Sequence, residues 1–228
     1  MATIANNLQL VRSRISQACL TVQRPPASVT LLAVSKTFPA ENVRDAFNAG
    51  QKLFGENYVQ EALDKIEALS DIRSQIQWHL IGPLQSNKTR PVAEAFDWVH
   101  TVDRLKIAQR LSEQRPDSLP PLQVCVQVNT SGEDSKSGCA PDEALALAQA
   151  VAKLPRLKLR GIMALPAPSP DPAVQHEALK QVRTHFSQWQ AAGLDVDTVS
   201  MGMSNDLEAA VQEGATMVRI GTAIFGHR

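Results

Sequence analysis

The sequence lacks an excess of charge of either sign, because 23 Lys and Arg residues balance 23 Asp and Glu residues. These charges are interleaved along the chain without a basic stripe, so we do not expect a protein that binds nucleic acid. No apolar run approaches the roughly 20 residues of a membrane helix. Residues 1–7 also lack the basic and apolar regions of a signal peptide. We therefore expect a cytoplasmic protein that does not span a membrane.

Cysteine is scarce, and the familiar site motifs are missing. Cys19, Cys125 and Cys139 are odd in number, and their spacings match no zinc or redox motif. No two histidines have the spacing of metal ligands, so the sequence predicts no metal site. There is no G-x-G-x-x-G turn, no P-loop and no G-x-S-x-G segment. A reducing compartment is the simplest environment for these cysteines.

Eight short apolar runs, rich in β-branched residues, are spaced along the chain. They cover Val29–Ser35, Lys52–Gly55, Gln77–Gly82, Trp98–Val102, Leu122–Asn129, Leu157–Ala164, Asp197–Met201 and Met217–Gly221. Most are nearly continuous, which is typical of parallel strands buried on both faces. Apolar residues at helical spacing fill the gaps, and this alternation predicts an α/β fold.

The predicted helical faces are carried by small groups of apolar residues between the runs. They are Val43, Ala46 and Phe47; Ala62, Ile66 and Leu69; Leu105, Ala108 and Leu111; Leu145, Ala148, Val151 and Ala152; Val182, Phe186 and Trp189; and Leu207, Ala210 and Val211. Eight repeats allow a closed (β/α)8 barrel or an open doubly wound sheet. The open form expects a glycine-rich turn after an early strand. Its absence and the chain length favour the barrel, as one domain over residues 1–228.

An amphipathic helix precedes the first predicted strand. Its apolar stripe consists of Leu8, Val11, Ile15, Cys19 and Val22. After the eighth strand only residues 223–228 remain, too few for a full eighth helix. Strands one and eight are neighbours in a closed barrel, so we expect this helix to complete the outer ring. The alternative is a helix that binds a partner.

The predicted strands end in polar groups that a barrel would bring to one rim. Lys36 follows the first strand, where it could be an ordinary surface lysine or a lysine that bonds to an aldehyde. Phosphate often binds in these barrels after strands seven and eight. There the sequence offers Ser200, Gly202, Ser204, Gly221 and Thr222. A lysine amine and a phosphate site on one rim suit pyridoxal 5'-phosphate (PLP).

Three further polar residues lie within or directly after predicted strands. Arg219 interrupts the last apolar run, and a buried arginine needs a partner, either a salt bridge inside the barrel or a ligand. Asn57 and His79 follow or end strands two and three. A lone histidine such as His79 is more often structural than functional, so both possibilities stay open.

Seven segments of the chain closely resemble the family of PLP-binding, or PLP homeostasis, proteins. They are LLAVSKT, FGENYVQE, WHLIGPLQSNK, VNTSGEDSKSG, RGIMAL, SMGMSNDLEAA and VRIGTAIFG, and they cover nearly the whole chain in family order. The resemblance implies the barrel of alanine racemase and other fold type III PLP proteins. It also implies that the second β-domain of the racemase is missing, and hence a monomer.

The resemblance assigns roles to residues of this chain. It implies that Lys36 holds PLP as a Schiff base, that Arg219 approaches the pyridine nitrogen and that Asn57 and His79 line the pocket. Ser200, Gly202, Ser204, Gly221 and Thr222 fall in its phosphate-binding segments. Lys136 matches a second lysine of the family that receives or relays the cofactor. Some members carry a further lysine where this chain has Phe38, and a lysine-rich tail where it has His227-Arg228.

Three functions remain open on the sequence alone. An arginine beside the ring nitrogen opposes its protonation and weakens PLP as an electron sink. The first hypothesis is therefore a non-catalytic protein that buffers PLP or delivers it to PLP-dependent acceptor enzymes. The second is a slow amino-acid racemase or lyase, for which the single tyrosine, Tyr58, is not marked as a base. The third is a scaffold whose PLP state signals to a partner.

Overall fold

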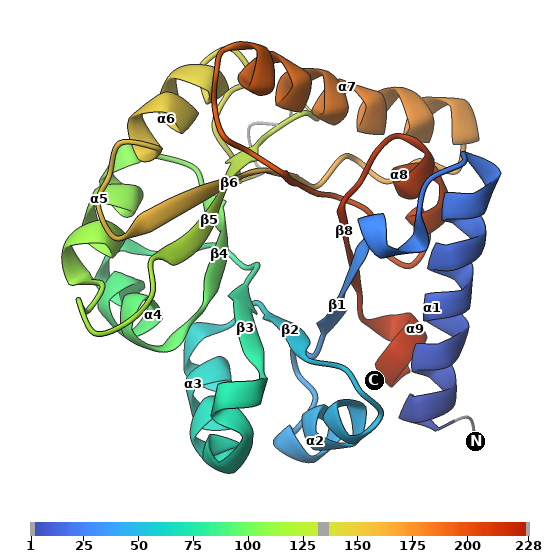
Figure 1. Cartoon of the computed structure of the whole chain (residues 1–228), viewed down its shortest axis with the longest axis horizontal. Helices are drawn as coiled ribbons and strands as arrows, with labels where there is room; N and C mark the ends of the chain where they lie inside the picture. The colour runs from blue at the N-terminus through green and yellow to red at the C-terminus, as the bar shows by residue number, and fades with distance from the viewer. Residues whose placement is uncertain (1–2, 132–136, 227–228) are drawn as a thin grey trace.

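The computed structural model describes residues 3–131 and 137–226, which form a closed barrel of parallel strands surrounded by helices (Figure 1). The strands follow one another around the barrel in chain order: β1 Thr30–Val34, β2 Leu53–Glu56, β3 Gln77–Leu80, β4 Trp98–Val102, β5 Leu122–Val128, β6 Leu157–Ala164, β7 Thr198–Ser200 and β8 Met217–Ile220. The barrel closes where β1 pairs with β8, with Ala33 opposite Ile220. The prediction of a closed barrel rather than an open sheet is confirmed.

Helices follow the strands and cover the outside of the barrel. They are α2 Ala40–Asn48, α3 Val59–Ala68, α4 Thr89–Ala95, α5 Leu105–Gln114, α6 Ala144–Val151, α7 Pro172–Ala191, α8 Leu207–Gln212 and α9 Thr222–Phe225, with short 3-10 helices η1 Pro26–Ser28, η2 Ser70–Gln75 and η3 Ser86–Lys88. Most of the predicted faces are buried. Leu105 and Ala152 are exposed instead, because Leu105 is the first residue of α5 and Ala152 lies just beyond the end of α6.

The N-terminal helix α1, Ile4–Thr21, occupies the place that the very short α9 leaves in the outer ring. It packs against α8, α9 and α2, along the right-hand side of Figure 1. Leu8, Val11 and Ile15 are buried there as predicted. Val22 was wrongly placed on the stripe, because it caps the helix outside helical geometry and is 37% exposed.

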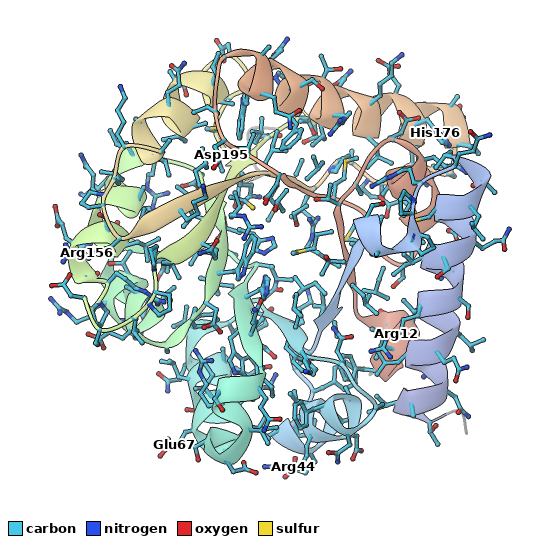
Figure 2. All side chains as sticks on the ribbon, viewed as in Figure 1. Arg12, Arg44, Glu67, Arg156, His176 and Asp195 are labelled. Atoms are coloured by element: carbon cyan, nitrogen blue, oxygen red, sulfur yellow. The ribbon has the colours of Figure 1, made fainter. Side chains whose placement is uncertain are left out.

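The side chains form two layers, one on each side of the strands. The larger apolar core lies between the barrel and its helices. Inside the barrel, small apolar clusters such as Leu32, Val34 and Ile81 share the space with buried polar side chains. Charged residues such as Arg44, Glu67 and Arg156 lie on the outer edge of the ring (Figure 2). No helix within residues 3–131 and 137–226 is both long and apolar enough to cross a membrane.

Candidate functional site

Strand alternation at the end of β1 sends Lys36 into the mouth of the barrel. Successive side chains of a strand point to opposite faces. Leu32 and Val34 pack inside the barrel, and Val34 and Lys36 line one cavity at its carboxyl end. Ser35, between them, is buried on the other side, where its hydroxyl donates a 2.6 Å hydrogen bond to Glu56 Oε1. The direction of Lys36 is therefore set by its place in the strand register.

The cavity has a volume of about 790 Å³ and is walled by segments that follow several strands. Its lining includes Arg14, Val34, Lys36, Asn57, Ile81, Leu165, Pro166, Pro168, Met203, Ser204, Asp206, Arg219, Gly221 and Thr222. Six of the nine predicted site residues are thus brought together: Lys36, Asn57, Ser204, Arg219, Gly221 and Thr222. His79, Ser200 and Gly202 are not among the lining residues. Lys136 lies outside the described residues.

Arg219 points from β8 toward the floor of this cavity and is almost fully buried. Its Nη1 donates to Ser200 Oγ at 2.7 Å and its Nη2 donates to the backbone oxygen of Ala164 at 2.9 Å. Burial lowers the pKa of Arg219 to about 10, so the guanidinium remains charged at neutral pH. The sequence left a salt bridge open as its partner. Among the described residues the partners found are neutral oxygens, which leaves the positive charge facing the cavity.

Ser200 continues a chain of buried polar groups down the inside of the barrel. Its hydroxyl lies 2.9 Å from His100 Nδ1, and His100 Nε2 lies 2.9 Å from His79 Nδ1. The His79 ring stacks on Trp98 with centroids 5.1 Å apart. Burial lowers the pKa of His79 to about 3 and that of His100 well below its ordinary value, so both rings are neutral. His79 is therefore connected to Arg219 only through His100 and Ser200, and it is not among the residues that line the cavity.

Gly202 serves close packing below the cavity. Its φ is +95°, in the left-handed region that favours glycine, and a Cβ there would lie 2.5 Å from the Cβ of Ala210 on α8. Ser200 and Gly202 thus hold the segment that carries Ser204, while the hydroxyl-bearing Ser204 itself reaches the cavity.

Arg14 ties this segment to α1 and was not singled out from the sequence. It donates to the backbone oxygen of Ser204 at 3.1 Å and forms a two-point ion pair with Glu208, at 2.8 and 2.9 Å. Asp206 also lines the cavity, and its carboxylate accepts a 2.5 Å hydrogen bond from the N–H of Met203. Nothing in the local sequence marks Arg14, because its partners Ser204 and Glu208 lie 190 and 194 residues away.

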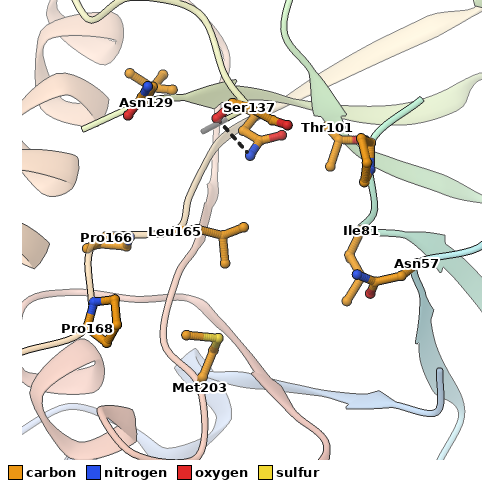
Figure 3. Close-up of a pocket in the computed structure, with 12 residues that line it drawn as sticks. Asn57, Ile81, Thr101, Asn129, Ser137, Leu165, Pro166, Pro168 and Met203 are labelled. Carbon is orange, nitrogen blue, oxygen red and sulfur yellow. Dashed lines mark hydrogen bonds between the residues drawn. The ribbon is translucent and has the colours of Figure 1, made fainter. Parts of the chain in front are cut away.

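A second chamber of about 300 Å³ opens beside the first (Figure 3). Asn57 and Ile81 lie across the smaller chamber from Leu165. The two chambers share six lining residues: Asn57, Ile81, Leu165, Pro166, Pro168 and Met203. Asn57 Oδ1 is buried and has no hydrogen-bond partner within the described part of the chain. An acceptor is thus left open where the two chambers meet.

Fold and site together define a class of protein. The family model for the N-terminal domain of alanine racemase matches residues 1–228. Proteins named pyridoxal phosphate homeostasis protein share 60% identity with the chain in Pseudomonas aeruginosa and 54% in Escherichia coli strain K12. Each match covers 100% of this chain, and 97% and 98% of the relatives respectively. The chain therefore belongs to the family of pyridoxal phosphate homeostasis proteins.

A solved structure is also similar over nearly the whole chain. PipY of Synechococcus elongatus PCC7942, solved with PLP bound, has a TM-score of 0.85 and 38% sequence identity to this chain. The match covers 98% of this chain and 100% of PipY. The expected family and barrel are confirmed, while the individual site residues stay predictions.

Proposed function

We propose that this protein binds PLP in the larger cavity, holds it through Lys36 and takes part in PLP homeostasis by buffering and delivering the cofactor. The observation that carries the proposal is the meeting of Lys36 and Arg219 in one cavity, from opposite sides of the β1–β8 closure. The names of the relatives and the PLP bound to PipY support it.

The residues around the cavity fit PLP in size and in chemistry. A volume of about 790 Å³ is within the range of small-molecule sites. The hydroxyls of Ser204 and Thr222 suit the phosphate, and the N–H groups of Arg219 suit the ring nitrogen. Gly221 lets the end of β8 run close against β1, since a Cβ there would lie 3.2 Å from the backbone oxygen of Val34. When bound, PLP supplies an aldehyde that a lysine amine can take up as a Schiff base.

Arg219 favours a carrier over an enzyme. PLP enzymes that stabilise carbanions need an electron-poor ring, and a cation near the ring nitrogen opposes its protonation. The pKa of Arg219, lowered by burial to about 10, still leaves it cationic at neutral pH. Its two hydrogen bonds to Ser200 and Ala164 also hold the guanidinium in place. Storage without turnover is the function that this arrangement suits.

The alternative is a slow racemase or lyase, since Lys36 could move a proton on one face of a substrate. A racemase also needs an acid–base group on the opposite face. Tyr58 is 56% exposed and is not among the residues that line either chamber. Solvent deuterium uptake at the α-carbon of amino acids separates the two functions. Appreciable uptake that Lys36→Ala abolishes would favour the enzyme.

Delivery requires partners, and we propose that PLP-dependent enzymes of the cytoplasm accept the cofactor from a monomeric form of this protein. The three cysteines are buried free thiols, which suits a reducing compartment. Sedimentation equilibrium with and without PLP tests the monomer. Transfer is tested by mixing the PLP-loaded protein with an apo-enzyme and following the recovery of enzyme activity.

The proposal as a whole is tested by the visible absorption spectrum of the protein with PLP, then by borohydride reduction and peptide mapping. We expect a yellow protein and a reduced adduct on Lys36. Lys36→Ala should abolish the adduct. Lys88 is an exposed lysine after β3, and Lys88→Ala should keep the adduct. A protein that stays colourless with added PLP would overturn the proposed function.

A further inference from the structure

A buried lysine lies behind the strand end that carries Lys36. Lys65, on α3, has a side chain only 6% exposed, although a free lysine is rarely buried. Its Nζ donates three hydrogen bonds: to the backbone oxygen of Ser35 at 2.8 Å, to Glu56 Oε1 at 2.8 Å and to Glu61 Oε1 at 2.6 Å. All three donors of the ammonium are therefore used.

The two carboxylates reach the residues on both sides of Lys36. Glu56 accepts the hydroxyl of Ser35 at 2.6 Å, and Glu61 accepts a short hydrogen bond from the backbone N–H of Thr37. Together with the bond from Lys65 to the Ser35 carbonyl, these contacts fix the peptide before and after Lys36. The cluster itself lies on the helix side of the strands, while Lys36 faces the cavity.

Thr37 needs this support because of its backbone. Its φ is +65°, in the left-handed region that a β-branched residue rarely adopts. Such a conformation persists where the surroundings enforce it. The hydrogen bond to Glu61 directly restrains Thr37, whose conformation turns the chain sharply after Lys36.

The electrostatics bind the cluster together. Burial raises the pKa of Glu56, against the opposing effect of Lys65. Burial also acts on Glu61, but the hydrogen bonds from Lys65 and Thr37 outweigh it and lower its pKa. Two carboxylates share one ammonium, so removing Lys65 leaves a buried carboxylate without its counterion.

We propose that Lys65, Glu56 and Glu61 are positioning residues for Lys36: they lock the peptides on both sides of it, so that its amine stays directed into the cavity. The proposal rests on the proposed function in so far as PLP is the ligand that Lys36 meets. It predicts that the cluster governs the bond to Lys36 and not the binding of the phosphate or the ring.

The test compares PLP with 4'-deoxypyridoxine 5'-phosphate, an analogue that lacks the aldehyde and cannot bond to lysine. Glu61→Ala removes the acceptor of the Thr37 N–H and should weaken PLP binding about ten-fold or more. The same variant should leave binding of the analogue within about two-fold. Glu61→Gln keeps an acceptor oxygen and should restore most of the PLP affinity.

Asp97→Ala is the matched control. Asp97 is also 30% exposed, accepts a backbone N–H, that of Trp78, at 2.8 Å and pairs with a cation, Arg73, but it precedes β4, away from Lys36. It should change the affinity for PLP and for the analogue by equal factors. If the Lys65→Met variant folds, it should show the same selective loss of PLP binding. If it does not fold, the Glu61 variants alone decide the test.

A crystal structure of the Glu61→Ala variant without PLP gives a readout that does not depend on the proposed function. We expect Thr37 to leave the left-handed region and Lys36 to turn out of the cavity. Equal losses for PLP and the analogue, no loss for either, or an unmoved Lys36 would each overturn the positioning role. A wild-type protein that binds neither compound would contradict the proposed function instead, and the crystal structure would still decide the positioning role.

Discussion

The guanidinium of Arg219 donates a 2.7 Å hydrogen bond to the hydroxyl of Ser200, which ends the neighbouring strand β7. The same hydroxyl lies 2.9 Å from His100 Nδ1, so one side chain joins the cation at the cavity floor to the buried histidines. Ser200, which the sequence predicts to bind phosphate, thus lies below the cavity and holds the guanidinium of Arg219.

Ser200→Ala should therefore destabilise the protein. The change leaves a buried guanidinium N–H and a buried imidazole nitrogen each without this partner, at a cost of about 1–3 kcal/mol in the free energy of unfolding. Urea unfolding measures it. Ser204→Ala is the control, since Ser204 is half-buried at the cavity. It should change stability by less than about 0.5 kcal/mol while weakening PLP binding. Equal stability losses in both variants would contradict the structural role assigned to Ser200.

Gly202→Ala tests the packing beneath the cavity. The new Cβ would meet the Cβ of Ala210 at 2.5 Å, in addition to the strain of a φ of +95°. Gly193→Ala is matched in backbone, with a φ of +84°, but a Cβ there meets nothing within 4 Å. We expect about 1–2 kcal/mol of destabilisation for Gly193→Ala. Gly202→Ala should cost about 1–3 kcal/mol more. Thermal unfolding of both variants measures the difference, and equal losses would mean that strain alone sets the cost.

The barrel, and the position of Lys36 at its carboxyl end, were predictable because local patterns determine both. Apolar runs and helical spacing fix the order of elements, and a polar residue after a run lies at the carboxyl end of its strand. The depth of a side chain inside the barrel is not local. His79 pairs in register with Gly55 and Trp98, and Ile81, two residues further on, is the one that reaches the cavity. Two strand residues span about 7 Å.

Partners that are distant in the sequence were also beyond prediction. His100 stands in an apolar run, and its partner Ser200 is 100 residues away. The pair Glu61 and Lys65 has the i, i+4 spacing of an ordinary exposed ion pair on a helix. Only the fold shows that Lys65 is buried and bonds to the residue before Lys36.

The N-terminal helix should be an integral part of the barrel. Leu8 is 1% exposed, and α1 is also tied to α9 by a 2.8 Å hydrogen bond from Asn7 to the backbone oxygen of Ile224. Leu8→Ala should lower the free energy of unfolding by about 2–4 kcal/mol. Leu10→Ala, on the outer face of the same helix and 63% exposed, should change it by less than about 0.5 kcal/mol. Denaturant unfolding compares them, and a small loss for Leu8→Ala would indicate a loosely attached helix.

The two buried histidines should make the protein sensitive to acid. Burial lowers the pKa of His79 to about 3, and burial together with the positive charge of Arg219 lowers the pKa of His100 well below its ordinary value. The pKa of such a histidine is lower in the folded protein than its ordinary value of 6.5 in the unfolded chain. The folded state is therefore most stable above pH 6.5, and this stability is lost as the pH falls toward 3. In this window unfolding takes up a proton at each ring. Each histidine should add about 1.4 kcal/mol per pH unit to the slope of the unfolding free energy.

His79→Gln should reduce that slope by one proton, because glutamine does not titrate. Its control is Gln127→Met, which removes a buried, uncharged polar side chain of the same barrel. The control should lower the unfolding free energy by a constant amount at every pH and leave the slope unchanged. Urea unfolding between pH 7 and the lowest pH at which the wild type folds reversibly measures both. An unchanged slope in His79→Gln would mean that His79 has the same protonation state in the folded and the unfolded protein, which would contradict the prediction.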